Sequence, residues 1–373
     1  MKLAMSAEQA ELRESVRRFL ADRAPLTRVR EIMDAPGHDE QVWAHAGSQL
    51  GLQGIAIPEE YGGSGFTFAE QAIILEELGA ALYTGPYLAS AVFAATALLA
   101  SKDEAARRDL LPGIASGETI ATVAFTEDDG SWEPDAIRLT ATREGDGWVL
   151  DGHKNFVLDG AAAGLLLVFG RTDAGLSMFA VPASPSPAEG LSLTRLATLD
   201  QTRELARCEF ASVPARLVGS PGDGSAILAR VLDVAAIALA AEQLGGAQRA
   251  MDMAVGYAKI RHQFGRPIGS FQAIKHRCAD LLMEVESLRS AVIYAAAAVA
   301  EDSPEVPTVA ALVKALASET YFHVAAENIQ IHGGIGFTWE HDAHLYFKRA
   351  KSSELFLGDA AYHRERLATR IGV

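Results

Sequence analysis

A turn between two long apolar segments carries side chains suited to an anionic, planar ligand. The segments, Ile227 to Lys259 and Phe271 to Ala300, both have the apolar pattern of helices that other helices cover. Arg261 and Arg266 lie in the turn, and Gln272 follows it. Guanidinium groups bind phosphate oxygens in pairs and stack on planar rings. The turn therefore suits a nucleotide-like ligand, although a helical hairpin with ordinary surface arginines is the better explanation of the turn taken alone.

Two further segments contain glycines in rare arrangements. Gln330 to Phe337 includes the adjacent Gly333 and Gly334, and Ile57 to Gly65 combines three glycines with Tyr61. Adjacent glycines let the backbone approach a ligand closely and direct successive N–H groups at phosphate oxygens. With these three motifs in this order, the chain resembles the acyl-CoA dehydrogenase family from about residue 5 to about residue 370.

The resemblance implies an FAD bound between subunits. In that family the Arg-x-x-Phe-Gly turn of one subunit and the Gln-x-x-Gly-Gly segment of its neighbour hold the adenosine diphosphate half. By this match, one side of the FAD is expected to meet Arg261, Phe264 and Gln272, and the other Gln330, Gly333 and Gly334. No Gly-x-Gly-x-x-Gly follows a predicted strand, so a Rossmann-type dinucleotide site is not predicted.

Composition restricts the possible partners. The chain has 373 residues and a net charge of −15, which argues against binding to nucleic acid or to an anionic membrane surface. Its apolar runs are too short or too broken to predict a membrane span, and Met1 to Leu20 carries acidic residues unlike a signal peptide. Cys208 and Cys278 are the only cysteines, with no redox or metal spacing, so a cytoplasmic protein without a metal site is expected.

The periodicity of the chain changes twice. Residues 1–118 have helical patterns, residues 119–222 contain short β-rich runs separated by Gly, Asp and Pro, and residues 223–373 are again helical. The expected fold is mainly α with a β middle domain. In the terms of the family it is an N-terminal helical domain, a β-barrel domain and a C-terminal four-helix bundle.

The family's catalytic carboxylate is missing from both positions where the resemblance places it. Many members carry the base in a Tyr-Glu-Gly-Thr segment, and here Leu357 stands at the Glu position; others carry it on the long helix before the arginine turn, where Ala235 stands. Glu242 is the best remaining candidate, because at about 100° per residue it lies about 20° from Ala235 on the same helical face. Its apolar surroundings, Ile237 to Ala241, would raise a carboxyl pKa towards that of a general base. A Glu paired with an arginine, or packed at a helix contact, is the equally weighted alternative.

The expected flavin contacts from the β domain are partly altered. Thr126 matches the family's Thr-Glu-Pro segment and can hydrogen-bond the pyrimidine edge of a flavin, with Asp128 in place of the proline. In the later Trp-Ile-Thr segment, Phe156 can still stack on the ring, whereas Leu158 lacks the hydroxyl. Asp359, next to the usual Glu position, is a further candidate for a flavin or partner contact.

These observations predict FAD-dependent α,β-dehydrogenation of an acyl-CoA, with Glu242 as base and an electron-transfer flavoprotein as acceptor. The chain would be a homo-oligomer or pair with an unlike acyl-CoA dehydrogenase chain. Phe337 to Tyr346 is similar to a bacterial branch of the family, acting on fatty acid or steroid side-chain esters, in which unlike chains pair. The alternative is accordingly a non-catalytic subunit that completes a partner's FAD site. A flavin oxidase that acts without CoA is a third possibility, supported only by the missing Glu.

Overall fold

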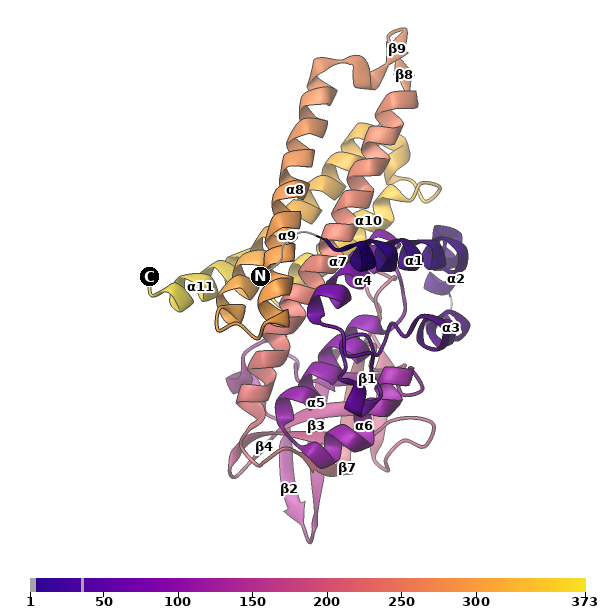
Figure 1. The fold of residues 1–373 in the computed structure, drawn as a ribbon. Coiled ribbons are helices and arrows are strands. Elements are labelled where there is room, and N and C mark those ends of the chain that lie inside the picture. The colour runs from indigo at the N-terminus through magenta and orange to yellow at the C-terminus, as the bar shows by residue number, and fades with distance from the viewer. Residues whose placement is uncertain (1–4, 35–36) are drawn as a thin grey trace. The chain divides into compact units, whose positions relative to one another are not determined.

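The computed structural model describes residues 5–34 and 37–373, which form two compact units (Figure 1). One unit, mostly helical, contains residues 5–31, Phe68–Tyr83 and Ala236–Val373. The other, which holds the β-sheet, contains the remaining described residues up to Thr67 together with Thr84–Ala235. Helix α7 (Gly224–Ile260) contributes residues to both.

The helical unit is built from long helices with locally encoded ends. Ser6 and Gln9 form a capping box that starts α1, with Ser6 as the N-cap. Gly372, in the left-handed conformation, ends the last helix. With α7, the helices of this unit are α1 (Ala7–Arg23), α2 (Leu26–Met33, which extends into the other unit), α4 (Phe68–Ala80), α8 (Gln272–Ala300), α9 (Val306–His332), α10 (Ala343–Leu355) and α11 (Ala360–Ile371).

Helices α4 and α7 cross with their backbones in contact. A Cβ added to Gly79 would lie 1.9 Å from the carbonyl oxygen of Glu242, and one added to Gly245 would lie 1.7 Å from that of Glu76. Only glycine fits at these two positions, so the crossing is encoded by one glycine on each helix. The crossing places the backbone of Glu242 directly beside α4.

One tip of the helical unit carries both the arginine turn and the glycine segment. The hairpin β8 (His262–Gln263) and β9 (Arg266–Pro267), followed by the 3-10 turn η4 (Ile268–Ser270), stands where α7 ends and α8 begins (Figure 1). The turn η5 (Gly333–Phe337) follows the end of α9. Ile268 of the hairpin side and Ile331 of α9 pack in the same small apolar cluster.

The β unit contains a closed barrel, as predicted. Its strands pair in the ring β4-β2-β3-β7-β5-β4, with β1 beside β4 and β6 beside β7. The strands are β1 (Ala121–Ala124), β2 (Thr140–Glu144), β3 (Gly147–Leu158), β4 (Leu165–Thr172), β5 (Gly175–Pro182), β6 (Leu191–Arg195) and β7 (Leu205–Val218). The helical elements of this unit are α3 (Glu40–Leu50), η1 (Glu59–Tyr61), the π-helix η2 (Leu88–Ala94), α5 (Ala95–Ser101), α6 (Glu104–Ser116) and η3 (Pro134–Ala136).

Apolar side chains from opposite strands fill the barrel. Phe179, Leu150 and Val168 belong to one core cluster, and all three are fully buried. Outside the barrel, α7 is long and apolar enough by composition to cross a membrane, but 78% of its most apolar window is buried in the structure, as in a core helix.

Candidate functional site

The arginine turn presents its side chains to solvent. Phe264 adopts a φ of 53° and its side chain is 91% exposed, an unusual position for an aromatic ring. Arg266 stacks over Phe271 at 4.1 Å, which fixes one of the two guanidiniums. The side chain of Arg261 is exposed and has no acidic partner in the described part of the chain. A cation and a ring left open at one tip suit a ligand with phosphate and a planar base.

The glycine segment presents bare backbone at the same tip. Gly333 has φ 65° and ψ −145°, a conformation essentially restricted to glycine. A Cβ added to Gly333 or Gly334 would meet no atom within 4 Å, so their backbone faces open space. Gln330 and Gln272 are also exposed.

Within this chain the two segments lie near one another. Ile268, which follows the hairpin, and Ile331, near the end of α9, belong to the same apolar cluster. The expectation that the FAD meets the arginine turn of one protomer and the glycine segment of its neighbour stays a prediction.

The residues of the β unit that are expected to contact the flavin lie at or beside an irregularity in β3. Between Lys154 and Val157 the pairing with β7 shifts, so the strand bulges at Asn155 and Phe156. Phe156 adopts a φ of 57° and remains 37% exposed. The hydroxyl of Thr126 donates to the carbonyl oxygen of Asn155, so towards a ligand Thr126 can only accept a hydrogen bond.

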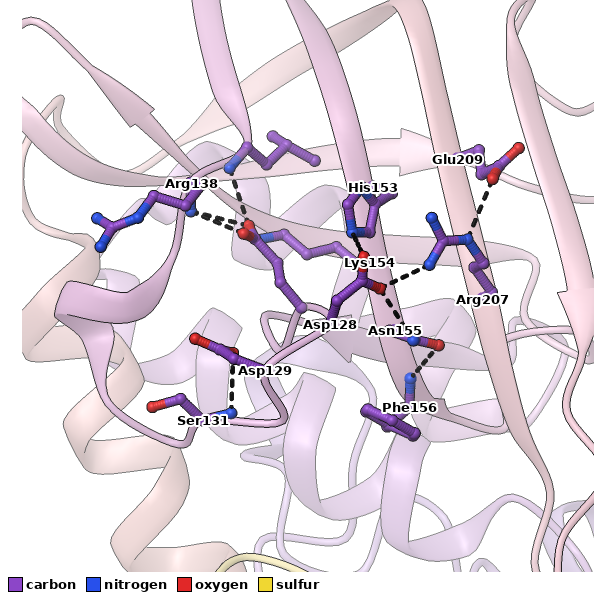
Figure 2. Close-up of polar contacts among 12 residues, drawn as sticks. Asp128, Asp129, Ser131, Arg138, His153, Lys154, Asn155, Phe156, Arg207 and Glu209 are labelled. Carbon is purple, nitrogen blue, oxygen red and sulfur yellow. Dashed lines mark hydrogen bonds and ion pairs between the residues drawn. The ribbon is translucent and has the colours of Figure 1, made fainter.

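A buried ion pair, which the sequence did not reveal, stabilises the segment after Thr126 (Figure 2). Lys154 is fully buried and donates to Glu127 at 2.8 Å. Burial lowers the pKa of Lys154 to about 8, although Glu127 opposes this effect. Burial also raises the pKa of Glu127, but Lys154 and the amides of Leu139 and Arg138 lower it more, so that its pKa lies below its ordinary value. The carboxylate thus remains ionised and ties the segment to the strand behind it.

The groups at the tip and those at the β3 bulge, each taken by itself, fit part of the cofactor that the resemblance implies. The tip offers an exposed guanidinium, an exposed ring and glycine backbone for phosphates, and the β3 bulge offers an aromatic ring beside a hydroxyl acceptor. FAD has an anionic diphosphate and two planar ring systems that match these groups. The individual residues named for FAD remain predictions.

Both of the family's base positions are apolar and buried. Ala235 is fully buried and Leu357 is 3% exposed. Leu357 adopts a φ of 65°, and its carbonyl oxygen accepts from His363 Nε2 at 2.9 Å. The ammonium of Lys314, also fully buried, donates to the carbonyl oxygen of Gly358 at 3.0 Å, to that of Glu354 and to the hydroxyl of Ser318. Contacts with His363 and Lys314 of the same chain therefore hold the loop Phe356–Asp359 in place, with the Leu357 side chain buried.

Asp359 has a local structural role. Its carboxylate accepts from the amide of Tyr362 at 2.8 Å and caps α11, while the residue stays exposed. A cofactor or partner contact by its other oxygen stays a prediction.

Glu242 is buried, as expected, but it lies beside a cation. Its side chain is 10% exposed and accepts from Arg349 Nη1 at 2.9 Å, and the Arg349 side chain is 4% exposed. Arg349 also donates to the carbonyl oxygen of Tyr83. A buried ion pair of this kind is costly to break, because removing either charge leaves the other desolvated. The arginine-paired alternative of the sequence analysis is thus what the structure contains, and the catalytic role of Glu242 stays a prediction.

Comparisons with known proteins agree with this architecture. Three domain families match in order: acyl-CoA dehydrogenase N-terminal domain over residues 6–118, middle domain over 122–212 and C-terminal domain over 222–372. The acyl-CoA dehydrogenase IpdE2 of Mycolicibacterium smegmatis is 37% identical over 371 residues, covering 98% of this chain and 100% of the relative. The ChsE4-ChsE5 complex from Mycobacterium tuberculosis has a chain with a TM-score of 0.90 and 30% identity, covering 100% of this chain and 99% of that one.

A further solved structure, a variant of the Tcur3481-Tcur3483 steroid ACAD, has a TM-score of 0.87 and 34% identity, with 99% of each chain covered. The family models together span nearly the whole sequence, and the relatives align from end to end. The chain belongs to the acyl-CoA dehydrogenase family of FAD-dependent oxidoreductases.

Proposed function

We propose that this chain takes part in the α,β-dehydrogenation of an acyl-CoA thioester as the base-free subunit of an enzyme made of two unlike chains. The observation that carries the proposal is the buried Glu242–Arg349 pair, together with the apolar Leu357 and Ala235 at the two positions where the family places its carboxylate. The partner chain would supply the base, and this chain would help to hold the FAD.

The chemistry explains why the missing base matters. A carboxylate must remove the acidic proton next to the thioester carbonyl, and bound FAD accepts the hydride from the next carbon. Leu357 and Ala235 cannot accept a proton. If Glu242 accepted it, a neutral acid would be left beside the buried guanidinium of Arg349, which is an unfavourable state. In this proposal the chain's own residues bind and orient, and they do not transfer the proton.

Relatives support pairing and indicate a substrate class to test first. One similar structure is a complex of two named chains, ChsE4 and ChsE5, and another is named a steroid ACAD with two chain designations. We therefore infer a cytoplasmic hetero-oligomer that degrades a steroid-derived or fatty acyl-CoA, and that passes electrons to an electron-transfer flavoprotein.

A homo-oligomeric dehydrogenase with Glu242 as its base is the second candidate. The observation in its favour is that Glu242 is only 8% exposed and lies in the apolar part of α7, where a carboxylate is shielded from water. This candidate requires Arg349 to move away from Glu242 when the substrate binds.

The experiment compares the chain purified alone with the chain co-expressed with an acyl-CoA dehydrogenase chain that carries the glutamate of the Tyr-Glu-Gly-Thr segment. Acyl-CoAs are added without oxygen and the flavin absorbance is followed. Bleaching by the co-expressed pair, with none by the chain alone, supports the proposal. Rapid bleaching by the chain alone would refute it, and peroxide formation in air without any CoA ester would point to an oxidase.

A further inference from the structure

The bulge that presents Phe156 is held by a side-chain bridge rather than by the β-ladder. At φ 57° an aromatic residue is strained, so neighbouring contacts must hold it there. The amide N–H of Phe156 donates to Asn155 Oδ1 at 3.1 Å. Asn155 Nδ2 in turn donates to Asp128 Oδ1 at 3.2 Å. Asn155 therefore connects the strained residue to a carboxylate on another segment.

The same asparagine is joined through its backbone to the segment that carries Asp128. Its amide donates to the carbonyl oxygen of Thr126 at 2.9 Å, and its own carbonyl oxygen accepts from the Thr126 hydroxyl. Residues 126–128 and 155–156 are thus connected at both backbone and side-chain level.

The guanidinium of Arg207 holds Asp128 in place, and His153 lies beside the carboxylate. Arg207 Nη1 of β7 donates to Asp128 Oδ1 at 2.7 Å, and His153 Nε2 lies 3.0 Å from Oδ2 (Figure 2). Arg207 is itself fixed by Glu209 at 3.1 Å. The hydrogen bond from Arg207 lowers the pKa of Asp128, so the carboxylate stays ionised and accepts from both Arg207 and Asn155. A proline, which the family has at this position, could make none of these contacts.

We infer that Asp128 is a positioning residue for the flavin ring: through Asn155, it holds the Phe156 ring and the Thr126 hydroxyl in the geometry in which they meet the cofactor. The observation is the continuous chain of hydrogen bonds from Arg207 through Asp128 and Asn155 to Phe156. The inference rests on FAD binding but not on which chain supplies the base. This chain departs from the family's Trp-Ile-Thr and Thr-Glu-Pro segments, and the bridge from Asp128 through Asn155 holds Phe156 in their place.

The test compares three variants in the protein as purified with its partner chain. Asp128→Ala removes the anchor, and Asp128→Asn keeps an oxygen that can accept from Asn155 and Arg207. Asp129→Ala is the matched control, because this neighbouring, exposed carboxylate makes only a local contact with the amide of Ser131 at 3.0 Å. Two quantities are measured: hydrogen exchange of the segment 153–158 in the FAD-free protein, and the FAD dissociation constant from the quenching of flavin fluorescence.

Asp128→Ala is expected to speed exchange at Phe156 and to weaken FAD binding about five- to tenfold, the loss of roughly one net hydrogen bond. Asp128→Asn should recover most of both effects, and Asp129→Ala should show neither. Unchanged exchange at Phe156, or equal effects of Asp128→Ala and Asp129→Ala, would overturn the inference. If the wild-type protein held no FAD, FAD binding itself would fail together with this inference, and that outcome is visible before any variant is compared.

Discussion

Phe156 and Leu357 are two of the non-glycine residues with a positive φ in this chain, but the exposure of their side chains differs. Phe156 has φ 57° and its ring is 37% exposed, whereas Leu357 has φ 65° and is 3% exposed. Each is held by polar groups around it, Asn155 in one case and His363 with Lys314 in the other. The same backbone geometry presents one side chain to a ligand and buries the other.

The β3 bulge and the tip of the helical unit leave side chains and backbone exposed, whereas the loop Phe356–Asp359 encloses the apolar side chain of Leu357. This combination is the one expected of a subunit that binds a cofactor without supplying the base.

The largest effect is expected from Arg349→Met. The variant removes the guanidinium from a buried carboxylate, Glu242, and should lower the free energy of unfolding by about 3–5 kcal/mol in urea titrations. Arg364→Met, which breaks an exposed pair with Glu319, is the control and should cost far less, because water screens an exposed pair. Equal costs for the two variants would show that Arg349 does not hold Glu242, and would favour Glu242 as a base.

An intermediate effect on the free energy of unfolding is expected when acid protonates His363, which contacts the loop Phe356–Asp359. Burial, and then the charge of Lys314, lower the pKa of His363 from 6.5 to about 3. Between pH 6.5 and about pH 3 the folded state therefore binds fewer protons than the unfolded state. The stability that neutral His363 contributes is fully present above pH 6.5 and is lost as the pH falls towards about 3.

His363→Gln keeps a donor for the carbonyl oxygen of Leu357 and should flatten this acid dependence of the free energy of unfolding, measured from about pH 7 to about pH 4. His276→Gln, at an exposed position on α8, should leave the dependence unchanged. If both variants keep the wild-type pH dependence of the free energy of unfolding, the titration of His363 does not contribute to the loss of stability in acid.

A smaller effect is expected at the tip. Arg261→Gln removes the open guanidinium and should weaken FAD binding about tenfold, or about 1.4 kcal/mol, with a smaller dependence on salt. Arg143→Gln, on the exposed hairpin of the barrel, is the control, measured by the same fluorescence titration. A tip that takes no part in FAD binding would show identical dissociation constants for both variants.

Much of the fold could be predicted from patterns local in the sequence. Ser6 and Gln9, three residues apart, mark the start of α1, and the glycine segments mark the tip of the helical unit. The strands near Ala121, Leu165 and Gly175 follow from β-rich runs bounded by turn residues. The missing base at Leu357 was also visible, because it depends on one residue type at one motif position.

The contacts that decide the function were not visible, because they join residues far apart in the chain. Glu242 meets Arg349, more than a hundred residues later, and helical periodicity gives only the face of Glu242 and not its neighbour. Asp128 was seen as a departure from the family pattern, but its bridge to Asn155 depends on a bulge in β3 that no alternation of residue types predicts. The proximity of the two segments at the tip became evident only from the apolar cluster that contains both Ile268 and Ile331.

The most direct test of the account is the rate of anaerobic flavin bleaching by an acyl-CoA in the co-expressed pair, compared between wild-type and Glu242→Gln. The amide of Gln can still accept from Arg349, so the variant should fold and retain FAD, which its absorbance verifies. The account predicts equal bleaching rates, because the proton is taken by the partner chain. Loss of bleaching in a folded, FAD-bound Glu242→Gln variant would contradict it.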